Sequence, residues 1–266
     1  MAAIGSNEMH ALVLKNVSKS FGGIDAVKDV DLVINVGENR ALIGPNGAGK
    51  TTLYNLITGE IRLDRGEILL FDNNLTHGPV RKRIQLGMGR TYQISNLFQE
   101  LTVQENLFLA AWKRGKISSS MLATLFRPWR RFDDHCSHTL KIARQVGLED
   151  KFNVPVSDLS HSEHRRLELG ITLAHDPKIL LLDEPMAGLS ASERSSMTEL
   201  IMGLGPEITV VIIEHDIDVA FSIAHRVSVL HQGSIIAEGS PEGIRANSQV
   251  QEIYTLSRNS NGHQHV

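Results

Sequence analysis

Short blocks of consecutive apolar residues recur along the chain and predict strands that are buried on both faces. A helix is expected between two of these blocks, because apolar residues recur at helical spacing from Met197 to Leu204. Buried strands that alternate with amphipathic helices indicate a mostly parallel sheet with helices on both faces. The blocks are Ala41–Ile43, Ile68–Phe71, Ile179–Leu182, Thr209–Ile213, Val227–Leu230 and Ile235–Ala237.

Two other regions have different patterns. Between Ala11 and Val36, partly alternating apolar positions surround the turn at residues 21–23, which predicts two antiparallel strands. From about Ser95 to Ala174 the pattern is helical. The fold class is therefore α/β, with a mostly parallel sheet, an N-terminal antiparallel β subdomain and a helical insert at about residues 95–174. We expect a single domain over residues 10–256 and a polar, flexible tail over residues 257–266.

Composition narrows the function classes. The 266 residues are 41% hydrophobic and 21% charged, with a formal charge of −3, which is ordinary for a soluble globular protein. There is no basic excess of the kind that nucleic-acid-binding proteins show. Cys136 is the only cysteine, so no intrachain disulfide is expected. The apolar blocks are far shorter than the roughly 20 residues of a membrane-spanning helix, so any membrane role requires a partner.

A glycine-rich segment supplies the first candidate site. Residues 44–51 match the pattern G-x-x-x-x-G-K-[ST] at every fixed position, between an expected strand and an expected helix. In such a loop the backbone N–H groups surround phosphate oxygens, the lysine reaches the β- and γ-phosphates, and the hydroxyl binds Mg²⁺. The alternative is a glycine-rich turn without a ligand. The candidate ATP-binding residues here are Gly44, Asn46, Gly47, Ala48, Gly49, Lys50, Thr51 and Thr52.

Two carboxylates supply the second candidate site. Asp183 and Glu184 follow directly on the apolar block that starts at Ile179. In P-loop proteins an aspartate in this place holds Mg²⁺, and a following acid polarises the attacking water. The alternative is a strand that ends in a solvated acidic turn.

Five further features give the sequence a family resemblance. Because of these features and their order, the chain resembles the ATP-binding subunits of ABC transporters over nearly its whole length. The resemblance implies a P-loop NTPase core. The features are an aromatic residue for the adenine at Phe21, a glutamine loop at Arg90–Gln93, a signature loop at Leu159–Glu163, a D-loop at Ala187–Ser190 and a switch histidine within Glu214–Asp216.

The resemblance implies roles for these residues. Two nucleotide domains would pair head to tail with ATP between them, and Ser160 and Ser162 of one subunit would approach the γ-phosphate held by the other. Ser160 and Glu163 also form a capping-box pattern at the start of a helix. Glu184 is expected to act as general base, and His215 to contact the γ-phosphate. Gln93 is expected to contact Mg²⁺ or the attacking water. The expected metal ligands are Thr51, Gln93 and Asp183.

Within the family, the chain is most similar to the subgroup that imports branched-chain (hydrophobic) amino acids. This resemblance rests on segments such as Gly89–Gln93, Leu101–Asn106 and Ile213–Asp216. It implies two membrane permease subunits, a second copy or a different ABC ATPase subunit, and indirectly a secreted or periplasmic solute-binding protein. The expected place is peripheral, on the cytoplasmic face of the inner membrane, without nucleic acid. The alternatives are urea uptake, lipopolysaccharide export, a cytosolic non-transport ABC ATPase, and a subunit that binds ATP but barely hydrolyses it.

One departure from the family pattern stands in the signature loop. The subgroup has a sequence such as Leu-Ser-Tyr-Gly-Glu-Gln, whereas this chain has His161, Ser162 and His164, and no glycine. Glycine allows a close backbone approach to phosphate. The change is either tolerated variation or a cause of weaker closure over ATP, which would require a partner with an intact signature.

Overall fold

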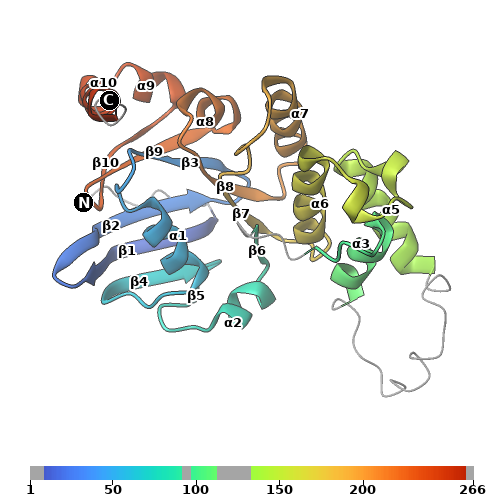
Figure 1. The fold of residues 1–266 in the computed structure, drawn as a ribbon. Coiled ribbons are helices and arrows are strands. Elements are labelled where there is room, and N and C mark those ends of the chain that lie inside the picture. The colour runs from blue at the N-terminus through green and yellow to red at the C-terminus, as the bar shows by residue number, and fades with distance from the viewer. Residues whose placement is uncertain (1–8, 92–96, 113–132, 262–266) are drawn as a thin grey trace. The chain divides into compact units, whose positions relative to one another are not determined.

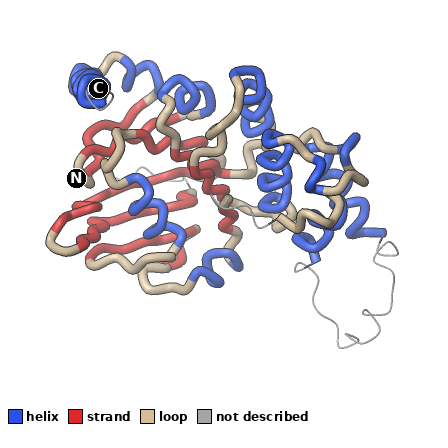
Figure 2. Tube along the Cα trace, in the orientation of Figure 1, coloured by secondary structure: helices blue, strands red, loops and turns tan. Residues whose placement is uncertain are grey.

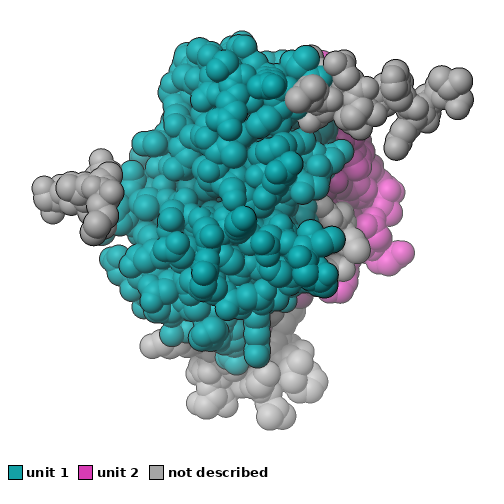
Figure 3. All heavy atoms as spheres, turned by 90° about the vertical axis from the view of Figure 1, so that its left-hand side faces the viewer, with its two compact units in different colours: residues 1–88, 178–184, 205–266 teal, residues 89–177, 185–204 magenta. Residues whose placement is uncertain are grey.

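The computed structural model describes residues 9–91, 97–112 and 133–261. The chain divides into two compact units, which Figure 3 colours separately. Unit 1 comprises residues 1–88, 178–184 and 205–266, and unit 2 comprises residues 89–177 and 185–204. Among the described residues, no helix is both long enough and apolar enough to span a membrane.

Unit 1 contains a four-stranded antiparallel sheet in the order β2-β1-β4-β5 (Figure 1). Leu12 in β1 lies opposite Ile34 in β2 and Leu70 in β4, and all three side chains are buried. The expected antiparallel subdomain is confirmed, with its first turn at Gly22 and Gly23. The strands are β1 (His10–Phe21), β2 (Ile24–Asn35), β4 (Arg65–Leu70) and β5 (Asn73–Asn74).

The second sheet has six strands in the order β10-β9-β3-β8-β7-β6 and is mostly parallel, as expected. Figure 2 shows the strands in red and the helices in blue. Strand β3 lies at its centre, parallel to β8 and β9, and all of its residues are buried. Strand β7 runs parallel to β8, and β10 runs antiparallel to β9. The strands are β3 (Asn39–Ile43), β6 (Met88–Arg90), β7 (Ile179–Asp183), β8 (Thr209–Ile213), β9 (Arg226–His231) and β10 (Ser234–Gly239).

A buried arginine fixes β3 just before the candidate phosphate loop. Arg40 pairs with Glu38 at 2.5 Å and with Glu238 at 2.6 Å, and it donates to Ser228 at 2.8 Å. Its side chain is almost fully buried. Because an unpaired buried charge is costly, these partners explain how the sheet tolerates it.

Helix α1 follows the loop and packs its apolar face into a core shared with strands of both sheets. It ends at Gly59, whose φ of 81° suits glycine at the end of a helix. The other helices described in unit 1 are short, apart from the last. The helices are α1 (Lys50–Thr58), α2 (Val80–Gln85), α8 (Ile217–Ile223), α9 (Pro241–Arg245) and α10 (Ser248–Asn261).

Helix α10 covers the first residues of the expected tail. It runs from Ser248 to Asn261, and the flexibility expected from Ser257 onward stays a prediction. No proline or glycine interrupts the sequence between Ser248 and Asn261, and the first such residue is Gly262. Polar composition alone does not end a helix, whereas a residue such as glycine does.

Unit 2 is helical, as expected for the insert. Within it Gly170 of α6 lies against Leu107 of α3 and Ile142 of α5, so these three helices pack closely. The insert expected at about residues 95–174 contains α3, α5 and α6, but unit 2 also contains α7. The elements are α3 (Val103–Trp112), α5 (Asp133–Gln145), the short 3₁₀ helices η2 (Glu149–Lys151) and η3 (Val156–Asp158), α6 (His161–Leu173) and α7 (Ala191–Met202).

Candidate active site

The loop between β3 and α1 has a conformation that requires glycine at defined positions. A Cβ atom at Gly44 would collide with the carbonyl oxygen of Leu230, and one at Gly49 with that of Ala26. Gly49 also has a φ of 102°, which other residues rarely adopt. Gly47 has a φ of 77° and open space around it. The glycines of the motif are therefore needed for the fold of the loop.

The first turn of α1 is left open to an anion. Its N-cap residue is Gly49, which offers no side chain as a cap, and no acidic residue lies in the first turn. Such a helix start presents backbone N–H groups and the positive end of the helix dipole. Thr51 is exposed, Thr52 is half-buried, Asn46 is exposed and Ala48 is buried.

Lys50 lies over its own loop. Its amino group donates hydrogen bonds to the carbonyl oxygens of Gly44 at 2.6 Å and Pro45 at 3.0 Å. Burial lowers the pKa of Lys50, and the negative charges of Glu184 and Asp183 oppose this effect. The ammonium group of Lys50 therefore interacts both with the loop carbonyls and with the negative charges at the end of β7.

The two acids and the histidine come together at the ends of neighbouring parallel strands. Asp183 ends β7 opposite Ile213 of β8, and the Glu184 amide donates to the Ile213 carbonyl at 2.9 Å. Nδ1 of His215 lies 3.6 Å from Oε1 of Glu184. Glu184 has a φ of 47°, an uncommon conformation for a residue with a side chain, and such residues are concentrated at functional sites.

Sequence reasoning gave no separate role to Glu214, which follows the end of β8 and directly precedes His215. Its side chain is 1% exposed, and Oε2 lies 3.9 Å from Nδ1 of His215. The signal available in the sequence was its position directly before the histidine. Two carboxylates, Glu184 and Glu214, therefore flank the same imidazole nitrogen.

Two expected residues remain, Phe21 and Gln93. Phe21 ends β1 with its ring half-exposed, and the amino group of Lys19 lies 5.3 Å from the ring centre. An exposed ring of this kind is free to stack on a base, as expected for it. Gln93 lies outside the described residues.

The start of α6 in unit 2 forms the expected capping box. The Ser160 hydroxyl accepts from the Glu163 amide at 3.3 Å, and the Glu163 carboxylate accepts from the Ser160 amide at 2.8 Å. The hydrogen bond from the Ser160 amide is the main cause that lowers the pKa of the Glu163 carboxyl. Ser162 is placed in the first turn, with its hydroxyl oxygen 3.2 Å from that of Ser160.

A comparison with protein families decides what this assembly of features means. A model of the ABC transporter family matches residues 27–187, which is more than half of the chain. The chain belongs to the ABC transporter family.

Curated proteins that resemble this ABC cassette cover almost its whole length. The high-affinity branched-chain amino acid transport ATP-binding protein LivG of Escherichia coli K12 is 37% identical over 248 residues, 91% of this chain and 96% of LivG. The high-affinity branched-chain amino acid transport ATP-binding protein BraF of Pseudomonas aeruginosa is 36% identical over 251 residues, 91% of this chain and 96% of BraF. The lipopolysaccharide export system ATP-binding protein LptB of Escherichia coli K12 is 30% identical over 247 residues, 92% of this chain and 97% of LptB.

Solved structures of ABC cassettes share the fold. The ADP conformation of one cassette of an ABC transporter has a TM-score of 0.81 and 28% identity, covering 93% of this chain and 99% of that one. A dimeric structure of another cassette, in a post-hydrolysis state with ADP and Pi, has a TM-score of 0.71 and 27% identity, covering 86% and 98%. The expected fold class, an ABC ATPase core with a mostly parallel sheet, is confirmed.

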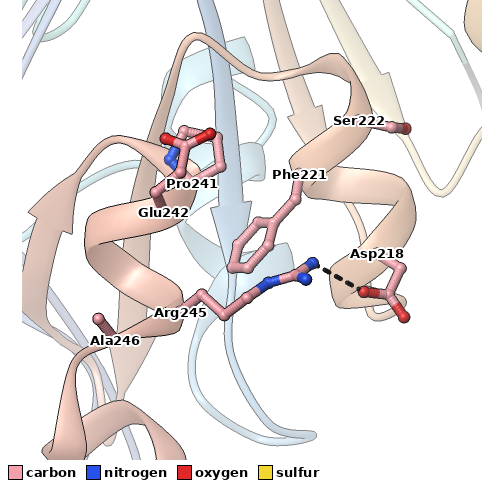
Figure 4. Close-up of a pocket in the computed structure, with 7 residues that line it drawn as sticks. All are labelled: Asp218, Phe221, Ser222, Pro241, Glu242, Arg245 and Ala246. Atoms are coloured by element: carbon pink, nitrogen blue, oxygen red, sulfur yellow. Dashed lines mark hydrogen bonds and ion pairs between the residues drawn. The ribbon is translucent and has the colours of Figure 1, made fainter.

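A surface hollow of about 550 Å³ in the cassette lies away from the residues of the loop and the acid cluster. Figure 4 shows the guanidinium of Arg245 between Phe221 and Asp218. It pairs with Asp218 at 3.0 Å and lies 5.3 Å from the centre of the Phe221 ring. Arg245 and Asp218 thus pair with each other, and the hollow is lined by none of the expected site residues.

Helix α10 brings one residue to the phosphate loop that sequence reasoning missed. Burial raises the pKa of the Tyr254 phenol, and the backbone amide of Gly44 opposes this effect. The hydroxyl is buried, without a hydrogen bond of good geometry. Nothing local in the sequence relates Tyr254 to Gly44, because some two hundred residues separate them.

Proposed function

We propose that this ABC cassette hydrolyses ATP and thereby energises the uptake of branched-chain or other hydrophobic amino acids through membrane permease partners. The observation that supports hydrolysis most strongly is the cluster of Lys50, Glu184 and His215 in unit 1. Phosphoryl transfer depends mainly on positioning and on neutralising charge. A buried ammonium, a carboxylate and an imidazole at one edge of a sheet supply both.

The residues of the loop fit a nucleotide and a magnesium ion. The open first turn of α1 suits phosphate oxygens, and Lys50 adds a cation whose present partners are two loop carbonyls. Thr51, Asp183 and Gln93 are the proposed magnesium ligands. When bound, the ion neutralises charge on the phosphates. The ring of Phe21 is the proposed stacking surface for adenine.

In this proposal each residue of the cluster has one task. The Glu184 carboxylate accepts a proton from the attacking water. Lys50 neutralises charge on the β- and γ-phosphates. His215 donates a hydrogen bond to the γ-phosphate from one side, while its Nδ1 faces Glu184. A histidine held by a carboxylate keeps a defined ring orientation.

The proposed working form is a head-to-tail pair of cassettes, either two copies of this chain or this chain with a different ABC ATPase subunit. The dimeric cassette with ADP and Pi supports such a pair. Ser160 and Ser162 would then approach the γ-phosphate bound by the opposite subunit. The open helix start of the P-loop and the hydroxyls of α6 would bind one phosphate from two sides.

The proposed partners are two membrane permease subunits and, indirectly, a secreted or periplasmic solute-binding protein. The proposed place is the cytoplasmic face of the inner membrane, where the cassette is peripheral. Nucleic acid is not among the proposed partners, since the formal charge is −3. The similarity to LivG and BraF, both branched-chain amino acid transport ATP-binding proteins, supports amino-acid import, and their identities of 37% and 36% exceed the 30% of LptB.

Transport is tested with the complete importer in membrane vesicles. The cassette, expressed with two permease subunits and a solute-binding protein of a branched-chain amino-acid importer, is expected to drive ATP-dependent uptake of labelled leucine. Urea uptake or lipopolysaccharide export in place of leucine uptake would identify one of the rival substrates. ATP hydrolysis without any coupling to permeases would favour a non-transport cytosolic ATPase.

Hydrolysis is tested with Glu184→Gln. This change is expected to lower turnover by about 10²–10⁴-fold, the usual contribution of a general base. Nucleotide binding is expected to remain, because the amide keeps the size of the side chain. Glu207→Gln serves as the control, since Glu207 lies in a surface turn of unit 1. Single-turnover hydrolysis within a few-fold of wild type would contradict the role of Glu184.

A further inference from the structure

Glu214 is a buried acid beside the catalytic cluster, and the hydrolysis proposed above does not use it. It follows the end of β8, and its side chain is only 1% exposed. Burial removes water from a carboxylate, so a folded protein retains one inside only where other groups interact with it. The imidazole of His215 is one such group, since its Nδ1 lies 3.9 Å from Oε2 of Glu214.

The imidazole faces two carboxylates that differ in exposure. Oε1 of Glu184 lies 3.6 Å from Nδ1 of His215, and the side chain of Glu184 is 39% exposed. The carboxylate of Glu214 lies at a similar distance and is almost fully buried. Opposite charges attract more strongly where less water screens them. The buried acid therefore attracts the imidazole strongly, although it lies slightly farther away.

The backbone on both sides of the histidine is fixed, whereas the imidazole is not. Before the histidine, the carbonyl oxygen of Ile213 accepts from the Glu184 amide at 2.9 Å. After it, the side chain of Asp216 caps helix α8. The side chain of His215 itself is 59% exposed. The direction of the ring therefore depends on the few charged groups that it meets.

The two acids cannot serve the histidine equally during the reaction. In the proposed hydrolysis, Glu184 acts on the attacking water, so its carboxylate is engaged with the reacting group. Glu214 is almost closed to solvent and has no such task. It therefore stays with the imidazole throughout the step.

We propose that Glu214 is a positioning residue for hydrolysis. Its carboxylate attracts the Nδ1 side of the His215 ring and so keeps Nε2 turned towards the γ-phosphate while Glu184 acts on the water. The partner of one ring nitrogen sets the orientation of the other. Glu214 itself makes and breaks no bond. This inference rests on the proposed function, because it requires that His215 contacts the γ-phosphate.

Glu214→Gln tests the proposal, because it keeps the size of the side chain and removes its charge. Single-turnover hydrolysis by the full chain is expected to slow about fivefold or more, since an ion pair across about 4 Å is worth roughly that factor even in bulk water. ATP affinity is expected to stay unchanged, because Glu214 acts through the histidine. Calorimetry measures this affinity in the Glu184→Gln background. A rate within about twofold of wild type would overturn the proposal.

A second background separates positioning from stability. If Glu214 acts through the imidazole, Glu214→Gln has no further effect on the rate once His215→Ala has removed the ring. A buried acid that only stabilises the fold would slow hydrolysis by the same factor in both backgrounds. Equal factors would therefore contradict the role of Glu214.

Glu38→Gln is the matched control for the loss of a buried charge. The side chain of Glu38 is 8% exposed, and it pairs with Arg40 at 2.5 Å. Both variants are expected to lower the melting temperature, because each removes one charge from a buried pair. Only Glu214→Gln is expected to slow hydrolysis by the protein that remains folded. The same loss of rate in both variants would mean that the partner of the charge is irrelevant, and the proposal would be wrong.

Failure of this inference is distinguishable from failure of the proposed function. If His215→Ala slows hydrolysis but Glu214→Gln does not, the histidine keeps its role and the inference alone is wrong. If His215→Ala has no effect, the role proposed for His215 fails, and the inference fails with it.

Discussion

Two helix starts in this protein are expected to meet phosphate, and they are built in opposite ways. Helix α1 begins after Gly49, with no side-chain cap and no acid in its first turn. Helix α6 begins after Ser160, whose hydroxyl and whose partner Glu163 form a capping box. The first start leaves its N–H donors for a ligand, whereas the second satisfies them from within the chain.

The difference has an energetic meaning. A serine N-cap stabilises a helix by about 1 kcal/mol relative to alanine but by only a few tenths relative to glycine, so Gly49 leaves the donors of α1 open at little cost. Its donors are therefore always available, which suits a primary binding site. At α6 the phosphate must replace contacts that already exist. The second site is therefore conditional, because it gains only the difference between two sets of hydrogen bonds.

The largest expected effect concerns the open end. Lys50→Ala removes the cation above the loop, and is expected to weaken ATP binding by about 10- to 100-fold, the range of a charge-assisted hydrogen bond. Lys28→Ala, which removes an exposed lysine of the same unit, is the control. Titration calorimetry with the monomeric protein measures both. Equal affinities of the two variants would contradict the assignment of Lys50.

A smaller effect is expected at the capped end. Ser160→Ala removes the cap of α6 and is expected to cost about 1 kcal/mol of stability. It should leave ATP binding by the monomer unchanged and weaken ATP-dependent dimerisation. Ser190→Ala removes the matching cap of α7 and should reduce stability by a similar amount. Thermal unfolding and sedimentation separate the two roles, and equal loss of dimerisation in both variants would show that only stability matters.

The smallest expected effect is a pH dependence of the capped ends. Hydrogen bonds from Ser190 lower the pKa of Glu193, the acid of the capping box of α7, from its ordinary value of 4.5 to about 2, so its contribution to stability is complete above pH 4.5. It is lost as the pH falls from about 4.5 towards 2. Glu193→Gln keeps an acceptor for the box but has no charge to titrate. The difference in melting temperature between wild type and this variant should therefore shrink between pH 6 and pH 3.

The start of helix α1 is an internal reference for the pH dependence of the capped helix starts. Helix α1 has no acid in its first turn, so its start contributes no matching carboxylate titration. Acidification weakens other parts of the protein as well, and that loss is common to both proteins. A difference in melting temperature that stays constant down to pH 3 would mean that the Glu193 charge contributes nothing.

Features set by neighbouring residues could be predicted from the sequence. The buried strand before Asp183, the helix after the glycine-rich loop and the capping box of Ser160 each depend on a few consecutive residues. The structure confirms all three. The roles proposed for Glu184, His215 and Gln93 in catalysis remain predictions, since they depend on a bound nucleotide.

Features set by distant residues could not be predicted. The inclusion of α7 in unit 2, with its contact between Arg166 and Ser196, joins helices that are separated by a strand of the other unit. Ser162 is expected to approach a phosphate, and the contact of 3.2 Å between its hydroxyl oxygen and that of Ser160 is visible only in the structure. Local patterns specify where a helix begins, but not which side chain from elsewhere meets it there.

The position of β3 at the centre of the parallel sheet has a consequence for synthesis on the ribosome. The antiparallel sheet is complete once residue 74 has emerged, whereas β3 pairs with strands that begin at Thr209 and Arg226. At about 5–20 residues per second, β3 waits roughly 10–30 s for its first neighbour. During that time an apolar strand with two unpaired edges is exposed, and it is a target for chaperones or for another nascent chain. The strand that carries the phosphate loop is therefore the part of this protein most at risk before the chain is finished.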